Sequence, residues 1–271
     1  MSIVLPIREV EKPWGSDVLP APFSAPEGKR IGEIWFEPPP ALPQLLVKYI
    51  FTSEALSVQV HPSDAETTAK GLGRQGKEEC WLIVAAEPDA KLGIGFREDL
   101  SQEAIRAAAL DGSIEQLMQW HPVQAGDFFY IPAGTVHAIG AGVSLIEVQQ
   151  NSDITYRLYD YGRPRELHLD DGVAVAHGTS YPSRLHQTVP ETGSQTLVDG
   201  PLFRLDQVEG PYGEDVAAAY GEEPLLVIPR TATVHIGGEE IAPGQCGVAP
   251  NLYAVAFDGR GSTLIAQPRT S

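Results

Sequence analysis

The sequence predicts a mainly β protein. Its apolar stretches are short, and most of them alternate apolar and polar residues, which is the spacing of a strand with one buried face. Glycine (27 residues) and proline (23 residues) are abundant, as expected for a fold with many tight turns. The chain of 271 residues is long enough to bury one large core or two smaller ones.

The first part of the chain contains eight expected strands and one helical region. The strands are β-rich or alternating runs at 32–37, 45–51, 55–61, 79–86, 91–96, 127–132, 144–150 and 154–161. After the fifth run, Ile105, Ala108 and Ala109 fall on one helical face, and the same spacing recurs beyond Gly112. Residues 99–120 are therefore predicted to form two short amphipathic helices inserted between strands.

A polar segment separates this part from a second set of strands. Residues 177–196 contain proline and glycine and lack any periodicity, which predicts a linker. Strand spacing then resumes at 202–209, 224–229, 232–238, 252–257 and 262–267. We therefore expect an N-terminal domain over 1–176 and a C-terminal domain over 197–271.

The two parts resemble degraded copies of one unit. GDFFYIPAGTVH, which ends at His137, matches GQCGVAPNLYAV, which ends at Val255, at an offset of 118 residues. Upstream, Glu79 aligns with Glu223 at an offset of 144, and the difference of 26 is about the length of the helical insertion. An internal duplication explains both offsets. The second copy carries valine where the first carries His137.

Charge and composition exclude several classes of partner. The formal net charge of −17 disfavours nucleic acid and anionic membranes, which both require a basic surface. No apolar run reaches the roughly 18 residues of a membrane-spanning helix, and the N-terminus lacks a signal-peptide pattern. Only two cysteines are present, so we expect a reducing, cytoplasmic location. A small anionic substrate remains compatible with this charge, because local lysine and arginine side chains set the potential of a pocket.

Four side chains are candidate metal ligands. Gln59 and His61 are two residues apart on an expected strand, so they share one face. Glu79 opens a later strand, and His137 follows a bend that Pro132 and Gly134 introduce. Two imidazole nitrogens, one carboxylate and one amide oxygen suit a zinc ion with a position left for water or substrate.

Each of these residues also has a purely structural interpretation. His61 precedes Pro62 and could simply end a strand, and His137 could be a turn residue. The joint spacing of the four favours the metal site. Cys80 is a less suitable ligand than Glu79, because neighbours on a strand point to opposite faces; we expect it to be a buried small apolar residue.

The segment from Gly126 to His137, G-x5-P-x-G-x2-H, resembles the second conserved motif of the cupin superfamily. The Gln59-Val60-His61 stretch and Glu79 correspond to its first motif. This resemblance implies two cupin-like β-barrels of the jelly-roll type in tandem. The metal would then lie in the N-terminal barrel, and the C-terminal barrel would be degenerate and without metal.

Six blocks in order extend the resemblance to a family. They are KPWG (12–15), GEIWF (32–36), LSVQVHPSD (56–64), GKEECW (76–81), GDFFYIPAGTVHAIG (126–140) and EVQQNSDITYRLYDYGRPRELH (147–168). The chain resembles the type I phosphomannose isomerases, in particular their short bacterial form. The resemblance implies one zinc ion on Gln59, His61, Glu79 and His137, and it implies that Arg157 is the active-site arginine. It further implies interconversion of mannose 6-phosphate and fructose 6-phosphate through a cis-enediol.

The residues leave several assignments open. Lys77, Glu147 and a zinc-bound water are equal candidates for moving the proton, and Glu147 could instead orient a ligand. Arg157 and Arg163, with Lys48 as a further choice, are expected to meet the phosphate, because guanidinium groups bind it bidentately. The partner is then a small phosphorylated sugar, and the protein a monomer or a homodimer.

Two other functions compete with the isomerase. An iron-dependent cupin oxygenase usually has a second histidine where this chain has Gln59, which argues against that class. A non-catalytic sugar-phosphate sensor would keep the pocket without turnover. The candidate ligand set and Arg157 favour catalysis.

Overall fold

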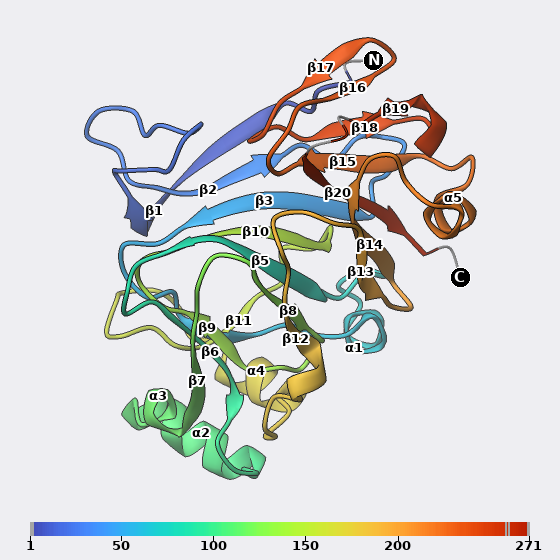
Figure 1. The fold of residues 1–271 in the computed structure, drawn as a ribbon. Coiled ribbons are helices and arrows are strands. Elements are labelled where there is room, and N and C mark those ends of the chain that lie inside the picture. The colour runs from blue at the N-terminus through green and yellow to red at the C-terminus, as the bar shows by residue number, and fades with distance from the viewer. Residues whose placement is uncertain (1–2, 258, 260, 270–271) are drawn as a thin grey trace.

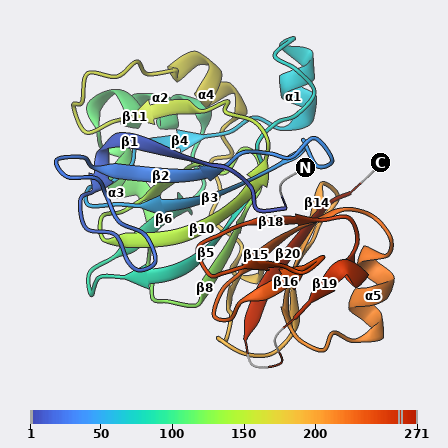
Figure 2. The same ribbon diagram turned by 90° about the horizontal axis from the view of Figure 1, so that it is seen from above.

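A computed structural model describes residues 3–257, 259 and 261–269 and confirms a mainly β fold built from antiparallel sheets. The largest sheet has seven strands and lies in the middle of the molecule (Figure 2). Its strands, in order across the sheet, are β1 (Ile7–Ser16), β2 (Ile31–Phe36), β3 (Leu45–Phe51), β10 (Val143–Gln150), β5 (Glu79–Ala86), β8 (Asp127–Ile131) and β12 (His186–Thr188).

A five-stranded sheet packs on one face of this central sheet. It consists of β11 (Tyr156–Tyr159), β4 (Val58–Val60), β9 (His137–Ile139), β6 (Lys91–Phe96) and β7 (Met118–Pro122). The core between the two sheets contains Trp81 and Leu145 from the central sheet and Ile94 and Ile139 from the smaller one. Burying these side chains stabilises the fold by roughly 25 cal/mol for each Å² of apolar surface that is removed from water.

Helices cover the outer face of the five-stranded sheet. They are α2 (Gln102–Asp111), α3 (Ile114–Leu117) and α4 (Leu169–Val175), at the end of the molecule farthest from the C-terminal half (Figure 1). The helical insertion expected at 99–120 is confirmed, with Ile105, Ala108 and Ala109 buried against the sheet. A further helix, α1 (Asp64–Ala69), starts at a capping box formed by Ser63 and Glu66. No described helix is both long enough and apolar enough to cross a membrane.

The C-terminal half forms two smaller sheets. One contains β13 (Gln195–Asp199), β14 (Phe203–Glu209), β20 (Ser262–Pro268), β15 (Leu225–Pro229) and β18 (Gly247–Ala249). The other contains β17 (Glu239–Ile241), β16 (Val234–Ile236) and β19 (Val255–Ala256). Three short helices complete this half and the connection before it: α5 (Glu214–Tyr220), η1 (Ser183–Leu185) and η2 (Leu252–Ala254).

The expected barrels are sandwiches of open sheets. Within the described residues no sheet closes on itself: β1 and β12 are the edges of the central sheet, and β11 and β7 are the edges of its partner. The twist of two facing sheets encloses a core without a ladder between their edges. The site residues therefore lie between two sheets, which gives them the same shielding from solvent that a barrel interior would give.

The two halves share one continuous core. Val47, Tyr49 and Val148 of the central sheet pack in the same apolar cluster as Leu226 and Leu264 of the C-terminal half. The segment 177–196, expected as a linker, contains η1 and also β12, which pairs with β8 at the edge of the central sheet. The connection is thus anchored over part of its length to the N-terminal half.

The strand ladders agree with an internal duplication but change one correspondence. β5 pairs with β8 and β10, and β15 pairs with β18 and β20 in the same arrangement. Glu79 lies opposite Ile131, and the residue 118 positions after Ile131 is Ala249, which lies opposite Leu225. The position of Glu79 is therefore taken by buried Leu225 rather than by Glu223, the residue that the sequence alignment indicated.

Candidate metal centre

Backbone pairing brings two of the candidate ligands side by side. Gln59 on β4 and His137 on β9 are direct cross-strand partners, so their side chains leave the sheet on the same face. On β4, Val58 and Val60 point to the opposite face and pack against the helices. The period of two therefore directs Gln59 into the space between the sheets.

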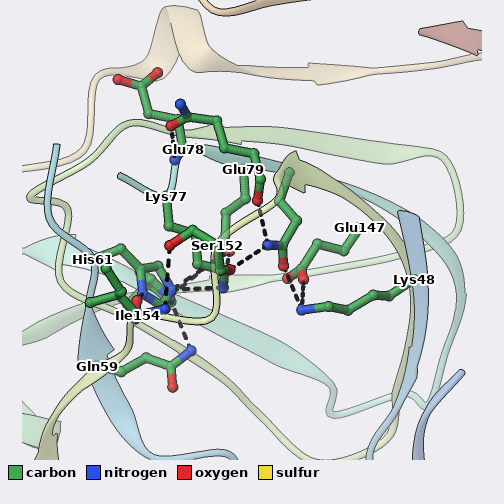
Figure 3. Close-up of polar contacts among 12 residues, drawn as sticks. Lys48, Gln59, His61, Lys77, Glu78, Glu79, Glu147, Ser152 and Ile154 are labelled. Atoms are coloured by element: carbon green, nitrogen blue, oxygen red, sulfur yellow. Dashed lines mark hydrogen bonds and ion pairs between the residues drawn. The ribbon is translucent and has the colours of Figure 1, made fainter. Parts of the chain in front are cut away.

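The other two candidates reach the same space from neighbouring segments. His61 follows β4, and Glu79 is the first residue of β5 in the facing sheet. The Nε2 atom of His61 lies 3.6 Å from Oε2 of Glu79, and Nε2 of His137 lies 3.4 Å from Oε1 of Glu79. His61, Glu79 and His137 are fully buried, and their ligand atoms lie within 4.8 Å of one another. Figure 3 shows the side chains of Gln59, His61 and Lys77 gathered close together in this cluster.

Hydrogen bonds fix which nitrogen of each imidazole faces the cluster. Nδ1 of His61 lies 2.9 Å from the carbonyl oxygen of Ile154, and Nδ1 of His137 lies 2.9 Å from that of Thr135. Each Nδ1 therefore carries the ring hydrogen and donates a hydrogen bond to the carbonyl oxygen, which leaves the unprotonated Nε2 of each ring on the side of Glu79. Burial lowers the pKa of His137 to about 4 and that of His61 well below 6.5, so both rings stay neutral near pH 7.

This donor set fits a divalent cation. Oε1 of Glu79 receives no hydrogen bond from any described residue and faces the lone pair of His137. Burial raises the pKa of Glu79 to about 7 despite the opposing charge of Lys77. Two neutral imidazoles and a carboxylate that point their lone pairs at one volume repel each other unless a cation lies between them. His61, Glu79 and His137 are thus a suitable set for zinc.

Lys77 supplies a partial substitute for such a cation. Its Nζ lies 2.6 Å from Oε2 of Glu79 and 3.1 Å from Nε2 of His61. Burial alone would lower the pKa of Lys77, but the carboxylates of Glu79 and Glu147 outweigh it and raise the pKa. The ammonium group therefore stabilises the cluster in the state that the structure shows.

The side chain of Gln59 does not turn its amide oxygen, the atom that could bind a metal, toward the cluster. Its Nε2 lies 3.2 Å from Nε2 of His137, and its Oε1 lies 3.3 Å from the hydroxyl of Ser57, which donates to it. To bind a cation together with His137, the amide must rotate so that its oxygen faces the cluster. The role of Gln59 as the fourth ligand stays a prediction.

A cavity of about 290 Å³ opens above the cluster. Gln59 and Lys77 line it on the side of the buried ligands, so the cluster lies directly beneath its floor. Five basic and three acidic side chains line the cavity, together with Trp14 and Trp35: Lys12, Lys48, Lys77, Arg157 and Arg165, and Glu33, Glu147 and Asp153. This size and polarity suit a small, polar, anionic molecule.

Lys48 and Glu147 form a buried ion pair in the cavity wall. They are cross-strand partners on β3 and β10, with Nζ 2.9 Å from Oε1. The other carboxylate oxygen accepts a hydrogen bond from the indole of Trp81 at 3.1 Å. Burial opposes ionisation of Glu147, but Lys48 and Lys77 outweigh it and lower its pKa to about 2. Lys48 also lies 4.6 Å from the ring centre of Trp35.

The candidate arginines occupy different surroundings. Arg157 lies opposite Gln59 in the β11–β4 ladder, so it is next to one of the candidate metal ligands. One of its guanidinium nitrogens donates to the carbonyl of Glu166 at 2.7 Å, while its buried Nε has no partner among the described residues. Arg163 does not line the cavity: it donates to the carbonyl of Ala55 at 2.5 Å and pairs with Asp160 at 3.1 Å.

Several lining residues were missed by the sequence reasoning. Arg165 lines the cavity where Arg163 does not, and it forms two contacts of 2.6 Å with Asp160. Trp35 and Asp153 lie within the blocks that carry the family resemblance, so these blocks were the available signal for them. No comparable signal separated Arg165 from Arg163.

Comparison with curated proteins identifies relatives of the chain. Mannose-6-phosphate isomerase ManA of Bacillus subtilis is 39% identical over 170 residues, which cover 59% of this chain and 54% of that protein. Mannose-6-phosphate isomerase of Streptococcus mutans is 35% identical over 228 residues, which cover 79% of this chain and 71% of that protein. The match to the Bacillus subtilis relative thus spans about half of its length. No family model matches the chain.

Solved structures with the same fold carry related names. The crystal structure of mannose 6-phosphate isomerase from Bacillus subtilis superposes with a TM-score of 0.75 at 22% identity, over 98% of this chain and 99% of that one. A zinc-bound mannose 6-phosphate isomerase superposes with a TM-score of 0.71 at 13% identity, over 98% of this chain and 99% of that one. These likenesses establish the fold. Together with the extent of the Streptococcus mutans match, they show that the chain belongs to the mannose-6-phosphate isomerase family.

Proposed function

We propose that this protein is a zinc-dependent aldose–ketose isomerase that interconverts mannose 6-phosphate and fructose 6-phosphate through a cis-enediol. One observation carries the proposal: His61, Glu79 and His137 bring their ligand atoms within 4.8 Å of one another beneath a cavity with five basic side chains. The names of the relatives supply mannose 6-phosphate as one substrate, and the cavity chemistry fits a small phosphorylated sugar.

His61, Glu79 and His137 would hold the ion, and Gln59 would join them after rotation of its amide. A bound zinc ion would supply Lewis-acid stabilisation of the negative charge that develops on the sugar oxygens, worth several kcal/mol. The ligands are buried, and electrostatic interactions are stronger in such a low-dielectric environment than in water.

Lys77 is the residue that we assign to proton transfer at Nζ. Its pKa is raised by Glu79 and Glu147, and burial alone would lower it. A cation held by Glu79 would offset part of the negative charge that keeps Nζ protonated, and burial would then favour the neutral amine. A neutral amine that lines the cavity can take the proton from C2 of the sugar and return it to C1, while the hydroxyl proton passes from O2 to O1.

Glu147 would act as a fixed charge rather than as the base. Both of its oxygens are occupied, one by Lys48 and the other by the indole of Trp81. Its depressed pKa makes it a weak proton acceptor. In this assignment Glu147 orients the ammonium group of Lys48, which can then hydrogen-bond a substrate oxygen.

Arginine side chains would bind the phosphate group of the substrate. Arg157 lies next to Gln59, and its Nε has no partner among the described residues, so it can contact the substrate close to the reacting carbons. Arg165 lines the cavity and can share its guanidinium between Asp160 and an anion. Arg163 would reach the phosphate only by leaving the carbonyl of Ala55.

A coupled assay tests the proposal directly. Purified protein is loaded with zinc, its metal content is measured, and formation of fructose 6-phosphate from mannose 6-phosphate is followed. Turnover that is lost with a chelator and restored by zinc supports the isomerase. Bound zinc without turnover at micromolar enzyme would support a sugar-phosphate sensor instead, and predominant iron with oxygen uptake would support an oxygenase.

A further inference from the structure

A second cavity lies on the other face of the central sheet, between the two halves of the protein. Its volume is about 420 Å³. Tyr49 of β3, Val84 of β5 and Ile146 of β10 form its wall on the sheet, the loop at 20–23 closes one side, and Pro243 and Gly244 of the C-terminal half close another. The lining is mostly apolar, in contrast to the charged cavity above the metal candidates.

One cation interrupts this apolar lining. The guanidinium of Arg230 donates to the carbonyl of Pro190 at 3.2 Å and to the side-chain oxygen of Gln207. Within the described part of the chain, no carboxylate oxygen comes within 4.0 Å of it, although Glu191 also lines the cavity. Arg230 is half-buried, and burial lowers its pKa. Its charge is therefore desolvated against neutral acceptors, a cost that an anion in the cavity would offset.

We propose that this cavity binds a small organic carboxylate with an apolar body. The carboxylate would pair with the guanidinium of Arg230, whose planar fork matches a carboxylate. The apolar body would pack on Phe23, Tyr49 and Val189, which all line the cavity. A sugar phosphate is a poorer occupant, because its hydroxyl groups would lose water against an apolar wall without gaining hydrogen bonds.

The site is separate from the metal cluster but is attached to the same strands. Tyr49 and Ile146 are cross-strand partners, and the next pair along the same two strands is Lys48 with Glu147. The first pair faces the apolar cavity and the second faces the charged one. A ligand of the apolar cavity can therefore bind without contacting the metal candidates, so its binding can be measured whether or not the protein is an isomerase.

Calorimetric titration of the full chain with phenylacetate tests the proposal. We expect one binding event per chain, and we expect phenylacetamide, which keeps the shape but lacks the charge, to bind at least about tenfold more weakly. Equal affinity for acid and amide would overturn the proposal. So would the absence of heat with phenylacetate, benzoate and octanoate up to about 10 mM, where even millimolar affinities are visible.

Variants locate the binding event. Arg230→Gln removes the charge and should weaken phenylacetate binding by about tenfold or more. Ala125→Phe, at an exposed position on the rim, keeps Arg230 but should block entry. Arg97→Gln removes an exposed arginine elsewhere and should leave the affinity unchanged. Unaltered binding to both Arg230→Gln and Ala125→Phe, with unfolding transitions like that of the parent chain, would place the ligand elsewhere and refute the site.

Discussion

The ammonium group of Lys77 lies 2.6 Å from Oε2 of Glu79, one of the candidate metal ligands. It also lies 3.1 Å from Nε2 of His61, a second candidate ligand atom. Lys77 and a divalent cation therefore compete for the same two acceptors. A cation bound to these acceptors would free Nζ of Lys77 to face the substrate cavity.

Replacing Lys77 should separate metal binding from turnover. Lys77→Met keeps the aliphatic stem and removes the competing charge, so zinc affinity should be at least as high as in the parent chain. Turnover should fall by about 10²- to 10⁴-fold, the usual contribution of a positioned acid or base. Metal content and the coupled assay report the two effects. Lys91→Met, at an exposed position, is the control; a Lys77 variant with near-normal turnover would contradict the assigned role.

Loss of an imidazole ligand should abolish the stabilisation that zinc gives. Zinc at about 100 times its dissociation constant should stabilise the parent chain by about 2.7 kcal/mol. His61→Ala and His137→Ala should lose this increment, whereas His235→Ala, at an exposed position, should keep it. Thermal unfolding with zinc and with a chelator measures the difference. Equal zinc stabilisation of all three variants would exclude this cluster as the site.

The pH dependence of the metal-free protein should report the buried imidazole of His137. Its folded pKa of about 4 lies below the ordinary histidine value of 6.5, so the unfolded state binds a proton more readily. The stability that His137 contributes is present above pH 6.5 and is lost as the pH falls toward 4, by up to about 3 kcal/mol. Glu79 has the opposite trend, because its raised pKa removes stability as the pH rises from 4.5 through 7.

A comparison of variants separates the pH dependence that His137 contributes to stability from the opposite contribution of Glu79. The difference in unfolding free energy between the parent chain and His137→Gln should shrink as the pH is lowered from 7 to 4. The same comparison with His235→Gln, whose side chain is exposed, should stay flat. Denaturant titrations in a chelating buffer measure both. A flat difference for His137→Gln would mean that this ring is not buried in its neutral form.

Breaking the buried pair of Lys48 and Glu147 should be costly. Lys48→Met leaves a buried carboxylate without its cation and should lower the free energy of unfolding by about 3–5 kcal/mol. Adding Glu147→Gln to the same chain should recover part of this loss, because no charge then stays unpaired. Lys70→Met, which breaks the more exposed pair with Asp171, should cost at most about 1 kcal/mol. Similar losses for Lys48→Met and Lys70→Met would rule out a strongly desolvated pair.

The bend before His137 should not tolerate a side chain. Gly134 has φ of 79°, and a Cβ there would lie 2.5 Å from the ring of His177. Gly162 has φ of 78° with nothing within 4 Å of such a Cβ. Gly134→Ala and Gly162→Ala thus share the backbone strain of about 1–2 kcal/mol, and only the first adds a clash. We expect only Gly134→Ala to weaken zinc binding as well; equal effects would show that the clash is relieved.

Strand spacing predicted the interior strands of the central sheet well. The expected bounds of β3 and β5 agree with the structure, because both strands are buried and rich in apolar residues. β1 was not predicted: it is an edge strand whose residues are mostly exposed, so its sequence carries little alternation. α4 was missed because Gly172 lies in its middle, and this glycine packs against Leu158, a contact that no local pattern reveals.

The candidate site likewise contains residues that the sequence predicted and residues that it did not. His61, Glu79 and His137 come together as expected, because strand period and motif spacing constrain them locally. The cavity wall depends on tertiary structure: Arg165 lines it and Arg163 does not, although both are loop arginines two residues apart. Their separation results from the carbonyl of Ala55, which is distant in sequence and accepts a hydrogen bond from Arg163. Glu223 was misaligned because a shift of two residues preserves the facing of a strand.

Successive residues along β3 and β10 of the central sheet face the two cavities in turn. An insertion or deletion within these strands would therefore place side chains in the wrong cavity. Inserting one residue within β10 would exchange the faces of Ile146 and Glu147. A carboxylate would then enter the apolar cavity, and an aliphatic side chain would replace it beside the metal candidates. Changes in chain length should therefore be tolerated only in the connections between strands, because the apolar and the charged cavity both depend on the register of the same strands.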